Sequence, residues 1–255
     1  MKPNPIYYSP QHFEFADSVR KFVQKELLPY VNEWEEAETF PKELYKKAAD
    51  IGLLGIGFDE NYGGIAGTDA FHVLLSSIEL AKTGSGGLCA SLLSHSIGAP
   101  PINHFASPEI KESVLTQILA GEKISALAIT EPSGGSDVAA LKTKAVRDGD
   151  DYILSGEKTF ITSGIRADYY TVAVRTDPDA KGPNGISMIL VDAHSQGITK
   201  SKLDKMGWWA SDTAHLHFDN VRVPAKNLLG AENMGFLVIM NNFNMERFFL
   251  AASSY

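Results

Sequence analysis

Residues 130–137 have the sequence Thr-Glu-Pro-Ser-Gly-Gly-Ser-Asp and mark the place where one sequence pattern gives way to another. They directly follow a short apolar run, residues 124–129, whose composition predicts a β-strand. Two adjacent glycines beside serines and a threonine make a loop whose backbone N–H groups can approach a ligand closely. An ordinary β-turn has the same composition, so the segment by itself leaves both interpretations open.

Beyond this loop the chain has the pattern of short strands separated by turns. Residues 143–146 and 152–154 flank a turn at residues 148–150, which predicts a β-hairpin. Further strands are predicted at three more apolar runs, residues 171–174, 186–191 and 215–218. Because no helical pattern separates these strands, a small antiparallel barrel or sandwich is favoured over a parallel sheet.

Helices are predicted on both sides of this β region. Ser9 and Pro10 suit an N-cap and a first helical position, and apolar residues then recur at spacings of three and four. More helices are predicted at residues 41–52, from Thr68 (which can cap the helix), at 88–105 and at 107–121. A helical pattern returns at residue 235 and continues to Tyr255 with no stop signal. The predicted fold class is α+β, with a helical domain at 1–122, a β domain at 123–232 and the start of another helical domain at 233–255.

The composition of the 255 residues excludes several classes of protein. Hydrophobic residues make up 44% and charged residues 21%, which are globular proportions. The net charge of −8 disfavours non-specific nucleic-acid binding, because an acidic surface repels phosphate backbones. No run of about 18 apolar residues predicts a membrane span. Residues 1–5 show neither a signal core nor an Arg-rich targeting pattern.

The common templates for metal and nucleophilic chemistry are not matched. The one cysteine, Cys89, lies in an apolar stretch and is predicted to be a buried, inert thiol. His215 and His217 alternate within a predicted strand, and structural or surface roles are favoured for them over metal binding. No metal site is predicted, and the single cysteine suits a reducing compartment.

Residues 128–137 resemble a signature of the acyl-CoA dehydrogenase family, and further matches follow in the family's order. These matches are residues 156–164, 205–207, 211–213, 218–224, 235–236 and 246–247. The closest resemblance in motif is to long-chain and isovaleryl-type members. It implies an N-terminal helical domain, a middle antiparallel β-barrel and a C-terminal four-helix domain, of which this chain would hold only the first helix. It also implies a homotetramer, in the bacterial cytoplasm or the mitochondrial matrix.

The resemblance further implies FAD, an acyl-CoA thioester with a medium, long or branched chain, and α,β-desaturation as in fatty-acid β-oxidation. Electrons would pass to an electron-transfer flavoprotein. The cofactor-binding positions carried over are Leu127, Ile129, Thr130, Gly135, Ser136, Phe160, Ile161 and Thr162. Phe160 stands where the family usually has Trp, and an aromatic ring there would lie against the flavin face. The Thr162 hydroxyl would lie close to flavin N5 and stabilise the charge that arrives with the hydride.

The resemblance implies that Glu246 is the base that removes the substrate α-proton. Long-chain and isovaleryl-type members place a glutamate at this point, and Arg247 would orient it or balance its charge. Burial would raise the pKa of the carboxylate and make it a better base. In the alternative interpretation, Glu246 is a solvated helix residue and the base lies in the family's C-terminal domain.

The remaining substrate contacts implied by the resemblance are Ser136, Asn184, Leu237, Asn244 and Arg247. Leu237 suits a plain core position equally well. Asn244 departs from the acidic residue common at that place in the family. The depth of the acyl pocket depends on packing around residues 92–102. Two other functions stay open: an acyl-CoA oxidase, in which dioxygen reoxidises the flavin, and a non-catalytic binding protein that keeps the fold.

Overall fold

The computed structural model describes residues 6–254, except for the side chains of Met245, Phe249 and Ser253. Expectations for residues 1–5 and Tyr255 lie outside the described residues. The N-terminal half forms short helices: α1 (Pro10–Phe22), α2 (Val31–Glu36), α3 (Glu43–Asp50), α4 (Ala70–Ala81), α5 (Gly86–Leu92), α6 (His95–Gly98), α7 (Pro100–Phe105), α8 (Pro108–Ile110) and α9 (Thr116–Leu119). The strands are β1 (Ser125–Ala128), β2 (Lys144–Asp148), β3 (Asp151–Ile161), β4 (Tyr169–Arg175), β5 (Ile186–Asp192), β6 (Ile198–Lys202), β7 (Ala214–Pro224) and β8 (Leu228–Leu229). The last helix is α10 (Gly235–Ser253).

The helical starts follow local capping chemistry. Ser9 is the N-cap of α1, as predicted, and it is linked to His12 in a capping box. Thr68 does not cap α4, contrary to the prediction: the N-cap is Asp69, whose carboxylate accepts from Phe71 N and His72 N. The Thr68 hydroxyl instead donates to Ile65 O and accepts from Gly57 N, so it closes the preceding loop.

The strands form one sheet in the order β6-β7-β3-β2-β4-β5-β8, with β1 paired to β4. The predicted hairpin is confirmed, because β2 and β3 pair antiparallel from Lys144 opposite Ser155 to Asp148 opposite Asp151. The strands expected within 171–174, 186–191 and 215–218 are also present, in β4, β5 and β7. The sequence patterns missed β6 and β8.

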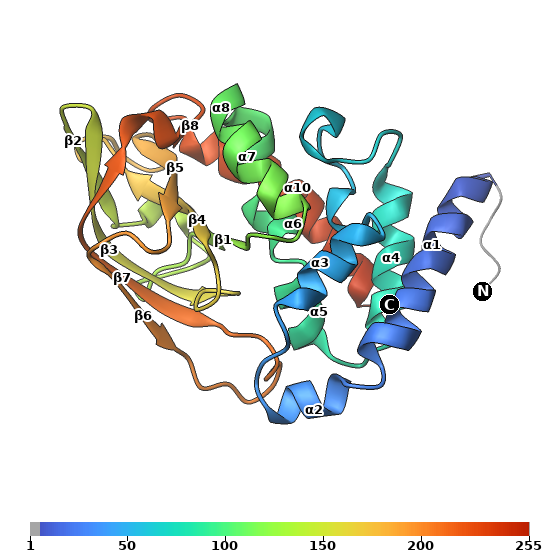
Figure 1. Cartoon of the computed structure of the whole chain (residues 1–255). Coiled ribbons are helices and arrows are strands. Elements are labelled where there is room, and N and C mark those ends of the chain that lie inside the picture. The colour runs from blue at the N-terminus through green and yellow to red at the C-terminus, as the bar shows by residue number, and fades with distance from the viewer. Residues whose placement is uncertain (1–5, 255) are drawn as a thin grey trace.

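The α+β class is confirmed, but the expectation of a closed antiparallel barrel is wrong. Among the described residues the sheet is open, with β6 and β8 at its ends, and β1 pairs with β4 in parallel. The pairing of β1 with β4 is parallel because β2 and β3 lie between these strands in the sequence. No hairpin turn joins β1 to β4, so the two strands need not run in opposite directions. Figure 1 shows the sheet on one side of the molecule and most of the helices on the other.

Helix α10 joins the two sides of the molecule. It packs against β5 on the sheet side and against α4, α6 and α7 on the helical side, and in Figure 1 it passes behind these helices. Val238 and Ile239 are buried in a cluster with Ile102 and Met188. Asn242 donates to Ile97 O at 2.8 Å, which ties α10 to α6 on the helical side.

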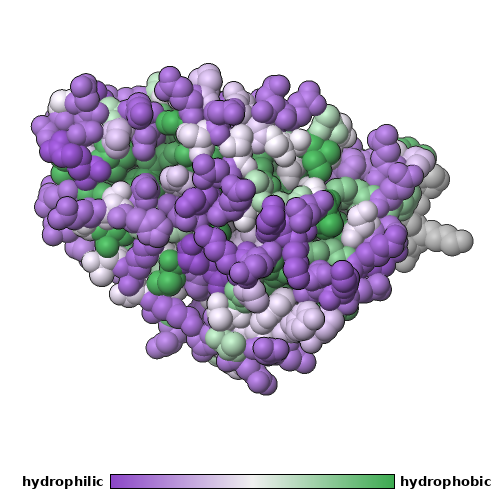
Figure 2. Space-filling view, in the orientation of Figure 1, coloured by the Kyte–Doolittle hydropathy of each residue, from purple (hydrophilic) through white to green (hydrophobic). Residues whose placement is uncertain are grey.

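The surface in the orientation of Figure 1 is mainly hydrophilic, with apolar residues showing between polar ones (Figure 2). Among residues 6–254, no helix combines the length and apolar character that crossing a bilayer requires.

Candidate functional site

A cavity of about 480 Å³ lies where α4, α5, the end of β3, the β6–β7 loop and α10 meet. Most of its wall is aliphatic or small, with several serines, and it includes Thr162 and the carboxylate of Glu246. The wall also includes Leu93 and Ile97, within the region expected to set the depth of an acyl pocket. Two predicted site residues from distant parts of the sequence therefore share one cavity.

Glu246 faces this cavity from α10. Its side chain is half-buried, and its Oε2 atom is buried with no hydrogen-bond partner among the described residues. Burial raises the pKa of this carboxyl above its usual value, and the nearby charge of Arg247 offsets part of the rise. The geometry suits a group that takes up a proton, since one oxygen is free to accept it.

Arg247 is exposed, and its guanidinium lies over the Phe243 ring, 5.5 Å from the centroid. Its charge therefore reaches Glu246 through space. The expected orienting role of Arg247 stays a prediction.

The end of β3 brings Thr162 to the cavity and Phe160 to the surface. Phe160 has a φ of 58° and is 70% exposed, while Ile161 is buried. Left-handed backbone is costly for a bulky residue, and it coincides here with a shift of register between β3 and β7. The irregularity exposes an aromatic ring two residues before Thr162, which lines the cavity.

The loop at residues 130–137 is held by a buried ion pair. Lys158 is fully buried on β3, and its Nζ donates to Glu131 Oε1 and to Ile129 O, both at 2.9 Å. The Glu131 carboxylate also accepts from Lys142 N and Thr143 N. Burial lowers the pKa of Lys158 to about 8, against the opposing effect of Glu131. The pair anchors the start of the loop to β3, and Glu131 also binds the backbone at residues 142–143; Thr130 is partly buried, and Gly135 and Ser136 are exposed.

Sequence reasoning missed the role of Lys158. The residue lies within the matched segment 156–164, and the available signal was a lysine inside a strand pattern with a glutamate in the preceding loop. The other predicted cofactor positions, Leu127 and Ile129, lie in or next to β1, partly buried and buried respectively.

The remaining predicted substrate contacts are not among the residues of the cavity wall. Asn184 is exposed in a turn, and its backbone O accepts from Arg175 Nη1 at 3.0 Å. Asn244 is exposed on α10. Leu237 is 59% exposed on the same helix, so the alternative of a core position is wrong for this chain.

Cys89 lines the cavity and is partly buried, a correction to the expected fully buried thiol. Burial raises its pKa, which keeps the sulfur protonated. His215 and His217 are near Glu157 on the sheet surface, at 3.8 and 3.4 Å.

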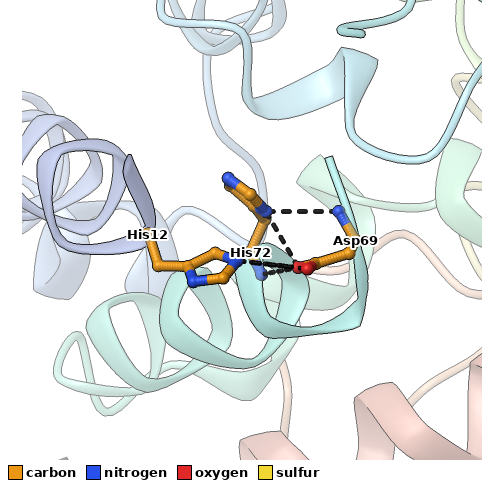
Figure 3. A group of neighbouring side chains, drawn as sticks. All are labelled: His12, Asp69 and His72. Carbon is orange, nitrogen blue, oxygen red and sulfur yellow. Dashed lines mark hydrogen bonds and ion pairs between the residues drawn. The ribbon is translucent and has the colours of Figure 1, made fainter. Parts of the chain in front are cut away.

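One cluster has the composition of a metal site: His12, Asp69 and His72 (Figure 3). His12 Nδ1 accepts from Ser9 N at 2.8 Å, and His72 Nδ1 accepts from Asp69 N at 3.2 Å. His12 Nε2 lies 3.0 Å from Asp69 Oδ1. Because both Nδ1 lone pairs are engaged by backbone N–H groups, the cluster is accounted for as two helix caps joined across α1 and α4.

The chain is similar throughout to known proteins. Residues 9–122 match the acyl-CoA dehydrogenase N-terminal domain, and residues 126–221 match the acyl-CoA dehydrogenase middle domain. The mitochondrial long-chain specific acyl-CoA dehydrogenase of Rattus norvegicus is 43% identical over 246 residues, covering 96% of this chain and 57% of the rat protein.

Two solved structures are similar in fold to this chain. A probable acyl CoA dehydrogenase from Mycobacterium abscessus has 46% identity and a TM-score of 0.93, covering 97% of this chain and 65% of that one. A glutaryl-CoA dehydrogenase from Mycobacterium smegmatis in complex with FADH2 has 34% identity and a TM-score of 0.87, covering 96% and 62%. This chain thus spans less than two thirds of the length of each of these three relatives.

Proposed function

Because the chain belongs to the acyl-CoA dehydrogenase family, we propose that it carries the site for FAD-dependent α,β-dehydrogenation of an acyl-CoA thioester. The acyl group would have a medium, long or branched chain. The observation that carries this proposal is the shared cavity of Thr162 and Glu246, because it places a hydroxyl donor and a carboxylate around one apolar space.

The residues present fit a flavin. Phe160 leaves a large apolar ring exposed two residues before Thr162. Stacking on a planar ligand would remove this ring from water. The loop that carries Gly135 and Ser136 is exposed but anchored by Lys158 and Glu131. Leu127, Ile129, Thr130 and Ile161 would complete the holding surface. FAD, when bound, would supply the acceptor for the hydride leaving the substrate β-carbon.

The proposed chemistry of the chain itself is proton removal by Glu246. Its unpartnered Oε2 would accept the α-proton as the α-carbon–hydrogen bond breaks. The raised pKa of Glu246 lies closer to the pKa of the weakly acidic α-carbon. The mostly apolar wall would limit the access of water that competes for the proton. The Thr162 hydroxyl would donate a hydrogen bond to the site of developing negative charge. Ser136, Asn184, Leu237, Asn244 and Arg247 remain proposed contacts for the CoA portion and the acyl path.

The test is anaerobic titration of the FAD-loaded protein with a panel of acyl-CoAs. Bleaching of the flavin by at least one acyl-CoA supports the proposal, and a protein that takes up FAD but is bleached by none contradicts it. A protein that cannot take up FAD under any condition favours the non-catalytic alternative.

We propose an electron-transfer flavoprotein as the electron acceptor. Admitting air after anaerobic reduction separates this from the oxidase: slow reoxidation of the product-bound protein supports the dehydrogenase, and rapid reoxidation supports the oxidase. We further propose the domain division 1–122, 123–232 and 233–255, a homotetrameric parent, and a bacterial cytoplasmic or mitochondrial matrix location. Size measurement of the parent protein with FAD bound tests the tetramer.

A further inference from the structure

Trp208 belongs to the wall of the cavity that holds Thr162 and Glu246, although it lies far from both in the sequence. It comes from the loop between β6 and β7 and has a φ of 58°, a conformation that a bulky residue adopts only when its surroundings impose it. Its side chain is 54% exposed, so the indole stands at the rim of the cavity with one part toward solvent.

Two glycines make room for this tryptophan. A Cβ on Gly86 would lie 2.5 Å from Trp208 Nε1, and a Cβ on Gly87 would lie 2.7 Å from the Trp208 backbone. Gly86 and Gly87 open α5, another wall of the cavity. The indole is therefore packed directly on the first turn of α5, and any side chain at position 86 would displace it.

The loop is also tied down by polar groups on both flanks. Lys205 Nζ donates to the backbone O of Trp208 and of Ser211. Glu35, from α2, accepts from Ala210 N at 3.2 Å and from the Ser85 hydroxyl, and Ser85 is the N-cap of α5. These contacts hold the rim residue and the helix it rests on in one fixed arrangement.

Most of the other wall residues are small or aliphatic, although Thr162 and Glu246 also belong to the wall. Those contributed by α4, α5 and the segments around α5 include Ala81, Gly84, Gly86, Ala90, Leu93 and Ile97. Trp208 is thus the largest side chain of the wall, and removal of its indole would widen the cavity at the rim. We propose that Trp208 is a specificity-determining residue that limits the length of acyl chain the cavity admits, an inference that rests on the proposed function.

The next residue provides a matched control. Trp209 is 46% exposed, its indole Nε1 donates to Lys205 O at 3.0 Å, and it is not part of the cavity wall. The substitutions Trp208→Ala and Trp209→Ala therefore remove the same side chain from the same loop, but only the first opens the cavity. Gly86→Ala keeps Trp208 and pushes its indole away, which tests position rather than presence.

The experiment measures kcat/KM of the FAD-loaded holoenzyme for straight-chain acyl-CoAs of increasing length. For Trp208→Ala, the ratio of kcat/KM for longer chains to that for the wild type's best chain rises by about tenfold or more, since one or two methylene groups in an apolar pocket are discriminated by that much. Gly86→Ala also changes the ratio, because its methyl group displaces the indole, and Trp209→Ala leaves it within about twofold.

A second readout does not depend on turnover. Binding of an enoyl-CoA quenches tryptophan fluorescence in the wild type and in Trp209→Phe, and Trp208→Phe loses most of this change. If the wild-type flavin is reduced by no acyl-CoA, the proposed function fails while the binding readout still decides the role of Trp208. An unchanged chain-length profile in both Trp208→Ala and Gly86→Ala overturns the inference. So does a shifted flavin spectrum in Trp208→Ala without a change of chain-length preference, which would assign Trp208 to the cofactor instead.

Discussion

The Glu246 carboxylate combines half-burial, an unpartnered Oε2 atom and a position in the wall of an apolar cavity. We predict that Glu246→Gln lowers the rate of anaerobic flavin reduction by the best acyl-CoA about 10²-fold or more, because an amide cannot accept the α-proton. Stopped-flow absorbance measures the rate. The control is Glu112→Gln, on an exposed helical surface. Near-wild-type reduction by Glu246→Gln would assign the base to another residue.

The raised pKa of Glu246 has a consequence for pH dependence. Burial favours the protonated carboxyl, so the carboxylate needed as a base forms only as the pH rises above the elevated pKa. We predict that the rate of flavin reduction falls on acidification, with a midpoint above the usual value of 4.5 for glutamate. A rate profile measured under saturating substrate checks this, and a midpoint at or below 4.5 would contradict it.

Single residues were predictable where a family motif names them, and not otherwise. Thr162 and Glu246 could be named from the resemblance, and the structure brings both to one cavity. Trp208 and Cys89 also line it, but no local pattern shows that a residue faces a cavity built from distant segments. Lys158 had a weak local signal, since only the fold shows that the Glu131 side chain reaches it.

At the scale of elements, the pair Lys158–Glu131 ties β3 to the loop that follows β1. We predict that Lys158→Met destabilises the protein by about 3 kcal/mol or more, because it leaves the Glu131 carboxylate buried without its cation. The double variant Lys158→Met with Glu131→Gln recovers part of this loss. Urea unfolding measures the stability. FAD affinity also falls in the Lys158→Met variant, because the loop at residues 130–137 loses its anchor. Equal stability of the single and double variants would contradict a stabilising ion pair.

The joint between α1 and α4 depends on Asp69. Its carboxylate caps α4 and contacts His12 across the helices. Burial tends to raise its pKa, but hydrogen bonds from His72, Phe71 and His12 outweigh this and lower it below 3.8. Because the folded-state pKa is depressed, the contribution of Asp69 to stability is present above the unfolded-state pKa and is lost as the pH falls through the folded-state pKa.

We predict that Asp69→Ala lowers the free energy of unfolding by about 1 to 2 kcal/mol at neutral pH, the usual cost of a lost N-cap. Asp69→Asn costs less, because an amide oxygen still caps the helix. The urea midpoint of each variant measures the loss, and the difference between Asp69→Ala and wild type shrinks below pH 3.8. A constant difference at all pH values would exclude a role for the ionised carboxylate.

The hairpin and most helices were predictable because their signals are local, although the helix predicted at 88–105 consists of α5, α6 and α7. The cap at Ser9 and the turn between β2 and β3 both lie within a few residues of the elements they define. The parallel pairing of β1 with β4 could not be predicted, because the two strands are separated by the whole β2–β3 hairpin. Strand β8 was missed because its two residues are too few to show any alternation.

At the scale of the whole molecule, the order of helices and strands followed from the sequence, but their packing into one unit did not. A single buried cluster includes Val19 and Leu44 from the helical side together with Leu154 and Tyr170 from the sheet. Helix α10 adds a second connection, because it packs against β5 of the sheet and against α4, α6 and α7. The cavity lies at this junction, so its shape depends on contacts between segments that no sequence window contains together.

This shared core leads to the last prediction: the helical and β regions unfold in one transition. The three tryptophans divide between them, with Trp34 buried on α2 and Trp208 and Trp209 on the β6–β7 loop. Trp34→Phe leaves the fluorescence of the β region, and Trp208→Phe with Trp209→Phe leaves that of the helical region. Neither region keeps its apolar cluster when the other unfolds. In each of the two proteins, the urea midpoint of the fluorescence transition therefore coincides with the midpoint of the circular dichroism transition. Different fluorescence midpoints in the two proteins, each departing from that protein's circular dichroism midpoint, would show instead that the helical and β regions unfold independently.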